Sequence, residues 1–140
     1  INLCDAFEKD DAVTFVRAED FNTKDLHDVE VLIVGSPTRG FNHSKGIKAF
    51  FNKIKTNGLT GIDVMAFDTR MDVESINNKF LTFMARNFGY AAEKIAKKLI
   101  RRGGRLIGKT EGFYVDDSEG PLSSGECDRA ISWVKDSVRK

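Results

Sequence analysis

The chain has 140 residues, of which 41% are hydrophobic and 31% are charged, and this predicts one compact domain over residues 1–140. Its 22 Lys and Arg residues balance 21 Asp and Glu residues, and a net charge of +1 gives no strong field for nucleic acid or an anionic membrane. Because no apolar run reaches the roughly 18–20 residues of a membrane helix and no signal-peptide pattern follows residue 1, we expect a cytoplasmic protein with neither kind of partner.

The first half of the chain alternates strand and helix patterns. Residues 12–17 are β-branched and aromatic and predict a strand, and residues 22–26 predict a polar, capped helical turn. Residues 30–35 form a nearly continuous apolar run, which is typical of a strand covered on both faces. After a loop at residues 36–42, Ser44 can cap a helix that runs to about Lys55 with its apolar residues at spacings of three and four.

The pattern continues beyond Gly58 and Gly61. Residues 62–67 predict a strand that ends in a loop at residues 68–71. A short helix is expected at residues 80–84 and a longer one at residues 88–102, with Ala92, Ile95, Ala96 and Leu99 facing inward. Gly103 and Gly104 follow a lysine- and arginine-rich last turn, and they predict where this helix stops.

The last part of the chain predicts one interrupted strand, over residues 105–108 and 112–115, and a final helix capped by Ser123 or Ser124. We expect Ile131, Val134 and Val138 on one face of that helix. Strands joined by helical crossovers run parallel. The order of elements therefore predicts an α/β doubly wound parallel sheet, built as a three-layer sandwich.

Ligands of such sheets bind outside the carboxyl ends of the strands, so the loops at residues 36–42 and 68–71 are the candidate site. Residues 112–122 are a third candidate segment, with a plain strand and long turn before the last helix as the alternative. Pro37 stiffens the first loop and Gly40 permits a positive φ, which suits backbone contacts to a planar polar ring. Arg70 in the second loop can stabilise an anionic ligand. The alternatives are a plain surface turn for the first loop and an exposed pair of Asp68 and Arg70 for the second. No metal site is predicted, because Cys4 and Cys127 lie far apart without a paired motif.

Four segments together resemble the flavodoxin family, in the branch with a Gly-Ser-Pro-Thr loop: VLIVGSPTRGFNHSKGIKAFFNKI, AFDTR, FGYAAEKIAKKLIRRGGRLI and EGFYVDDSEGPLSSGECDRAISW. The resemblance covers nearly all of the chain from Ala12 onward. It implies a flavodoxin-like five-stranded parallel sheet in the order 2-1-3-4-5 that carries FMN. It also implies that the two loops border the flavin ring, with these cofactor-binding residues: Ser36, Pro37, Thr38, Arg39, Gly40, Phe41, Asn42, Asp68, Thr69 and Arg70.

One element of the family is missing from the sequence. Flavodoxins begin with a central strand and a Ser/Thr- and Gly-rich loop that binds the FMN phosphate at a helix N-terminus, and nothing here matches it. Residues 1–7 cannot be that strand, because too few residues separate them from residue 12 for a parallel crossover. We therefore expect strand 1 to be absent from this chain and about 30 further N-terminal residues to exist in the full protein.

The resemblance implies an electron-transfer protein that serves redox partner proteins and whose cofactor carries out the chemistry. Since Arg39 and Arg70 lie on the two loops, Coulomb attraction to the reduced anion predicts a less reducing carrier than acidic flavodoxins. Two alternatives remain. One is a small FMN-dependent reductase of quinones or nitro compounds using NAD(P)H, for which a homodimer is expected, and the other is a cofactor-free binding or regulatory module. A receiver domain is disfavoured, because Lys109 is the only weak match to its lysine.

Overall fold

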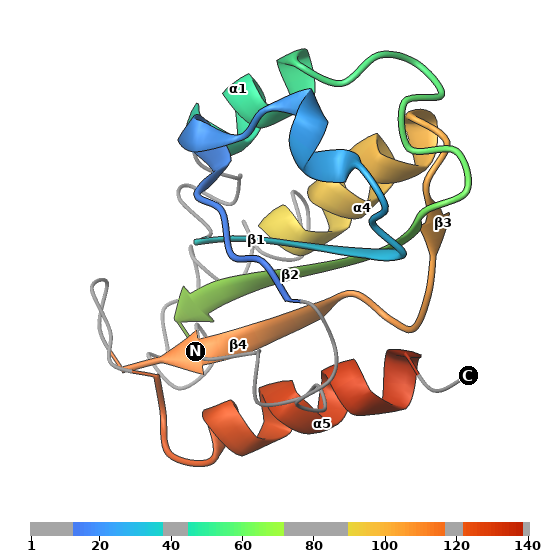
Figure 1. The fold of residues 1–140 in the computed structure, drawn as a ribbon. Helices are drawn as coiled ribbons and strands as arrows, with labels where there is room; N and C mark the ends of the chain where they lie inside the picture. Colours follow the sequence, from blue (N-terminus) through green and yellow to red (C-terminus); the bar gives the residue numbers. More distant parts are fainter. Residues whose placement is uncertain (1–12, 38–44, 72–89, 117–121, 139–140) are drawn as a thin grey trace.

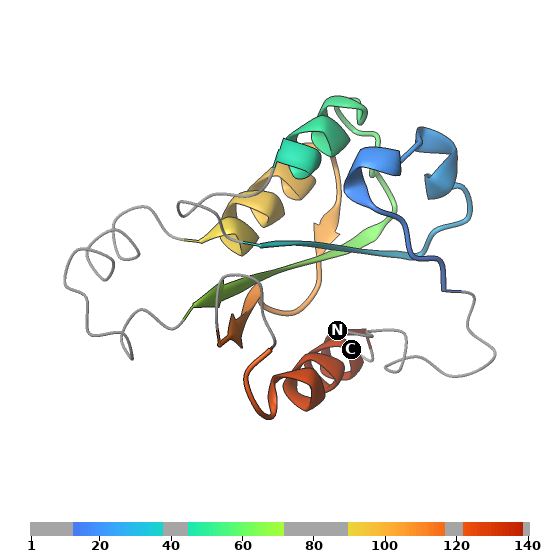
Figure 2. The ribbon, with the colours of Figure 1, turned by 90° about the vertical axis from the view of Figure 1, so that its left-hand side faces the viewer.

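The computed structural model describes residues 13–37, 45–71, 90–116 and 122–138. They form an open, parallel sheet with helices on both faces (Figures 1 and 2). Helices α1 (Lys45–Asn52) and α4 (Ala91–Arg101) cover one face, and α5 (Glu126–Val138) covers the other. The expected α/β class with a parallel sheet between two helical layers is therefore confirmed.

The sheet is built around strand β2 (Asp63–Met71). Strand β1 (Val31–Pro37) pairs with one side of it over seven residues. The short strands β3 (Arg105–Leu106) and β4 (Glu111–Val115) pair with the other side, at residues 63–64 and 67–71 of β2. Because β3 and β4 follow one another along the same neighbour, the prediction of one interrupted strand is confirmed.

The predicted helices that fall on described residues are present, but α1 ends at Asn52, before the predicted end near Lys55. The capped turn is the short helix η3 (Thr23–Leu26), in which the Asn22 side chain accepts from Lys24 N. It follows another short helix, η2 (Ala18–Asp20). The stop after α4 has the hydrogen bonds of a Schellman motif, from Gly103 N to Ile100 O and from Gly104 N to Leu99 O, with Gly103 at φ 94°. Helix α5 begins at Glu126, later than the serine caps predict, and the predicted cap Ser44 and the helix at residues 80–84 lie outside the described residues.

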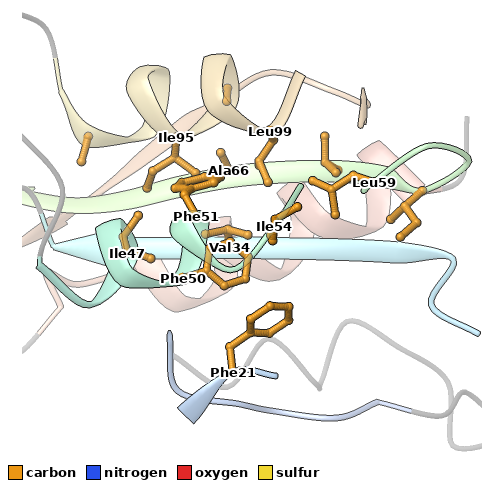
Figure 3. Packing of buried hydrophobic residues seen from close by; sticks show 14 residues of the cluster. Phe21, Val34, Ile47, Phe50, Phe51, Ile54, Leu59, Ala66, Ile95 and Leu99 are labelled. Carbon is orange, nitrogen blue, oxygen red and sulfur yellow. The ribbon is translucent and has the colours of Figure 1, made fainter. Parts of the chain in front are cut away.

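Side chains of β2 alternate between two cores, as the period of a strand requires. Val64 and Ala66 join the larger core under α1 and α4, while Met65 belongs to a second core under α5. Figure 3 shows the larger core, where Phe50 and Phe51 of α1 and Ile95 and Leu99 of α4 gather around the strands. Strand β2 therefore ties the two helical layers together.

The second core is packed through aromatic rings. Phe67, Phe113 and Trp133 meet edge to face, with ring centroids 5.7–6.0 Å apart. A Cβ on Gly35 would collide with the Phe67 ring, so the glycine in β1 leaves the room that this ring occupies. Trp133 is 9% exposed, and its Nε1 donates to Lys109 O at 2.8 Å.

The prediction of a strand over residues 12–17 is wrong for the described residues 13–17, which have no regular structure. Phe15 is 84% exposed there. A strand needs a neighbour to complete its hydrogen bonds, and the described part of the chain provides none beside this segment. Within the described residues the sheet consists of β1, β2 and the interrupted strand, in that order.

Candidate functional site

The carboxyl ends of β1 and β2 lie side by side at one edge of the sheet. In the parallel register Ser36 is opposite Asp68, and Pro37 is opposite Thr69. The structure therefore brings together the described members of the two predicted segments. The rest of the first segment lies outside the described residues: Thr38, Arg39, Gly40, Phe41 and Asn42.

The second segment is not the loop that the sequence predicts. Asp68, Thr69 and Arg70 belong to β2, which continues to Met71. The strand extends this far because β1 hydrogen-bonds it up to Thr69 on one side and β4 pairs with residues 67–71 on the other. Consequently these side chains alternate between the two faces of the sheet, where a loop could direct all of them toward one ligand.

Asp68 is fully buried and its carboxylate is satisfied by the protein itself. It accepts two hydrogen bonds from Arg70, from Nε at 2.6 Å and from Nη2 at 2.7 Å, and a third from the backbone N of Ala92 at 2.8 Å. Ala92 lies in the first turn of α4, whose N-cap residue Tyr90 makes no side-chain cap. The Asp68 carboxylate, which belongs to β2, therefore lies at the positive N-terminal end of α4.

Arg70 is held on three sides. Besides Asp68, its guanidinium lies over the Tyr90 ring, 3.7 Å from the centroid. It also covers Gly112 of β4, where a Cβ would collide with it. The side chain is 16% exposed, and within the described part of the chain its Nη1 makes no hydrogen bond. Arg70 therefore has a structural role here, with one nitrogen left for a ligand.

The sequence interpretation missed Tyr90, and it did not recognise that Gly112 leaves room for the Arg70 side chain. A glycine inside a strand is a signal that a bulky group approaches closely, so Gly112 could have been recognised as the space for a neighbouring side chain. Tyr90 carried no comparable signal, because its contact with Arg70 depends on how α4 packs on the sheet.

A second charged cluster closes the outer edge of β4. Glu126 of α5 is buried and accepts from the backbone N of Tyr114 at 2.7 Å, while Arg129 donates to Gly112 O. Arg129 also pairs with Glu126 and Glu111, at 2.7 and 2.9 Å. These side chains satisfy backbone groups that a further strand would otherwise bind.

The pKa values of this cluster follow from its contacts. The hydrogen bond from Arg129, helped by the one from Tyr114 N, lowers the pKa of Glu126 below its ordinary value although burial opposes this. The same carboxylates raise the pKa of Arg129, Glu126 first and Glu111 next. At neutral pH the three side chains stay charged and paired with one another, and they hold α5 against β4. Their role is therefore structural.

Among residues 13–37, 45–71, 90–116 and 122–138, no group of three or more His, Cys, Asp or Glu side chains could hold a metal ion. In the same ranges no helix has both the length and the apolar content to cross a membrane. A comparison with models of known protein families and a search of curated proteins found no match to this chain.

Proposed function

We propose that the chain is a flavodoxin-like protein that binds FMN at the carboxyl edge of β1 and β2 and passes electrons between redox partner proteins. The observation that supports this is the register that puts Ser36 and Pro37 beside Asp68 and Thr69. Parallel α/β sheets bind their ligands at this edge. In the proposed order 2-1-3-4-5, β1, β2 and the interrupted strand would be the third, fourth and fifth strands.

The described residues suit the ring of FMN better than its phosphate. Thr69 and Arg70 Nη1 are donors on opposite faces of the sheet at this edge, where each could donate a hydrogen bond to FMN, and FMN itself would supply the electron-accepting chemistry. The N-terminus of α4 is already occupied by the Asp68 carboxylate, which would repel a phosphate. The phosphate would therefore have to be bound by residues outside the described ranges.

The pairing of Arg70 changes the electrostatic expectation. Since Asp68 binds the Arg70 guanidinium through two hydrogen bonds, the opposite charges nearly cancel at the distance of a ligand. We therefore propose that Arg70 acts on a bound ring as a hydrogen-bond donor and contributes little net positive charge. A less reducing carrier would then depend on Arg39.

A cofactor-free binding or regulatory module is the second candidate. It is favoured by the contacts of Asp68 and Arg70, which bind each other, the end of α4 and the Tyr90 ring. In this interpretation the polar residues at the sheet edge stabilise the fold and bind no ligand.

Titration of the purified full-length protein with FMN and, separately, with riboflavin distinguishes the two candidates. Our proposal expects quenching of flavin fluorescence with saturation, and weaker binding of riboflavin because it lacks the phosphate. Thr69→Val should weaken FMN binding about three- to tenfold, the effect of one lost hydrogen bond, while Thr110→Val serves as the control. If neither flavin binds, the electron-transfer proposal is wrong and the cofactor-free module is supported.

A further inference from the structure

Positive charge is concentrated on the outer surface of α1 and α4. The two helices lie next to one another on the same face of the sheet (Figures 1 and 2). They carry six cationic residues and one acidic residue, Glu93. The cationic residues are Lys45, Lys48, Lys94, Lys97, Lys98 and Arg101. Helix α5 on the opposite face has three acidic and two basic residues. The positive charge is therefore concentrated on one face, although the net charge of the whole chain is near zero.

The cations of the two helices are close enough to act on one another. Lys98 Nζ and the guanidinium of Arg102 approach the same ring, that of Phe51 in α1, at 5.6 and 4.9 Å from its centroid. The pKa of Lys98 is lowered, first by burial and then by Arg102, Lys48 and other cations of the surface. A cluster of like charges costs free energy in the isolated protein, and an anionic partner would relieve that cost.

An exposed apolar residue lies on the same helix as four of these cations. Ile100 of α4 is 50% exposed, and Lys97 and Arg101 beside it in the sequence are exposed as well. We call Lys48, Lys97, Ile100 and Arg101 the basic surface.

Two other classes of partner suit the basic surface less well. A helix that binds lipid inserts its apolar face, but Ile95 and Leu99 of α4 are buried against the sheet. Single-stranded nucleic acid needs exposed aromatic rings for stacking, and the described rings of α1, Phe50 and Phe51, are buried in the core.

We infer that the basic surface docks an acidic surface of another protein. The inference depends on charge and exposure alone, and it stands whether or not the chain binds FMN. Charge complementarity of this kind speeds association and selects the partner more than it adds affinity. Binding should therefore weaken as salt is added.

The test uses a labelled short peptide of alternating glutamate and leucine as the probe, with its glutamine counterpart for comparison. Fluorescence anisotropy should detect binding of the acidic peptide only. The double variant Lys97→Glu with Arg101→Glu should lose about tenfold in affinity at low salt. The control is Lys109→Glu with Lys135→Glu, which makes the same change in net charge on the side of α5 and should keep the affinity. Ile100→Ser should weaken binding without any change in charge.

Far-UV circular dichroism of each variant confirms that it is folded before binding is compared. The inference is overturned if the acidic peptide does not bind, or if both double variants lose the same affinity, since net charge alone would then explain the effect. Tighter binding of duplex DNA or phosphatidylserine vesicles than of the peptide, at equal salt, would also overturn it.

Discussion

Asp68 and Arg70 illustrate how a residue pair can be recognised in a sequence and still be misjudged. Two positions apart on one strand, they point to the same face and bind through two hydrogen bonds. The alternative of an exposed ion pair is also wrong, because the Asp68 side chain is fully buried and that of Arg70 is 16% exposed. Burial makes the pair matter for stability, since each charge depends on the other.

Asp68→Asn should destabilise the protein by about 3–5 kcal/mol, because the substitution leaves the buried Arg70 without its carboxylate. Urea unfolding followed by circular dichroism measures the loss. Strand β2 offers a matched control in Asp63→Asn, which breaks the exposed pair with Arg105 and should cost much less. Equal losses in the two variants would show that burial does not set the value of the pair.

Among the elements, α5 and β4 depend on each other. Glu126 and Arg129 of α5 close the edge of β4 by bonding to the backbone of Tyr114 and Gly112. This arrangement protects an open strand edge from pairing with another chain. The contact is electrostatic and therefore depends on pH.

Stability should fall as the protein is acidified below the ordinary Glu126 pKa of 4.5. The folded state lowers the pKa of Glu126, so its carboxylate stabilises the fold above that value and the contribution is lost as the pH drops through the folded pKa. Glu126→Gln should be less stable at neutral pH and show a shallower acid decline in urea unfolding measured across pH. The acid decline should become shallower and not disappear, because the pKa of Asp63 is also lowered, by Arg105, and its carboxylate contributes to the same decline. An unchanged slope would contradict the role of Glu126.

At the scale of the whole molecule, the two cores share β2 and cannot separate without breaking it. Val64 and Ala66 face one core while Met65 faces the other. A protein of this size with one shared central strand should unfold as one cooperative unit.

The single tryptophan makes this testable, because Trp133 reports only on the core under α5. Urea transitions followed by Trp133 fluorescence and by far-UV circular dichroism should coincide. A fluorescence transition at lower urea would mean that the α5 layer unfolds by itself. Ile107→Ala in that core should shift both transitions together.

Local patterns in the sequence were sufficient for the elements that the structure bears out. The apolar run before Gly35, the spacing of Ile47, Phe50 and Phe51, and the glycines after α4 each correspond to an observed element. These patterns work because burial of a face and the conformation at a helix end depend on residues a few positions apart.

Tertiary structure decided what those patterns could not. Residues 13–17 have strand-like composition but no neighbouring strand in the described part of the chain, and residues 68–70 extend β2 because β1 and β4 lie beside them. Likewise the partners of Arg70, namely Tyr90 and Gly112, are distant in sequence. Strand pairing and the burial of a charge are set by segments that meet only after folding. The sequence by itself therefore determined the elements that local patterns mark, while packing determined which strand-like segments pair and which polar side chains remain available for a ligand.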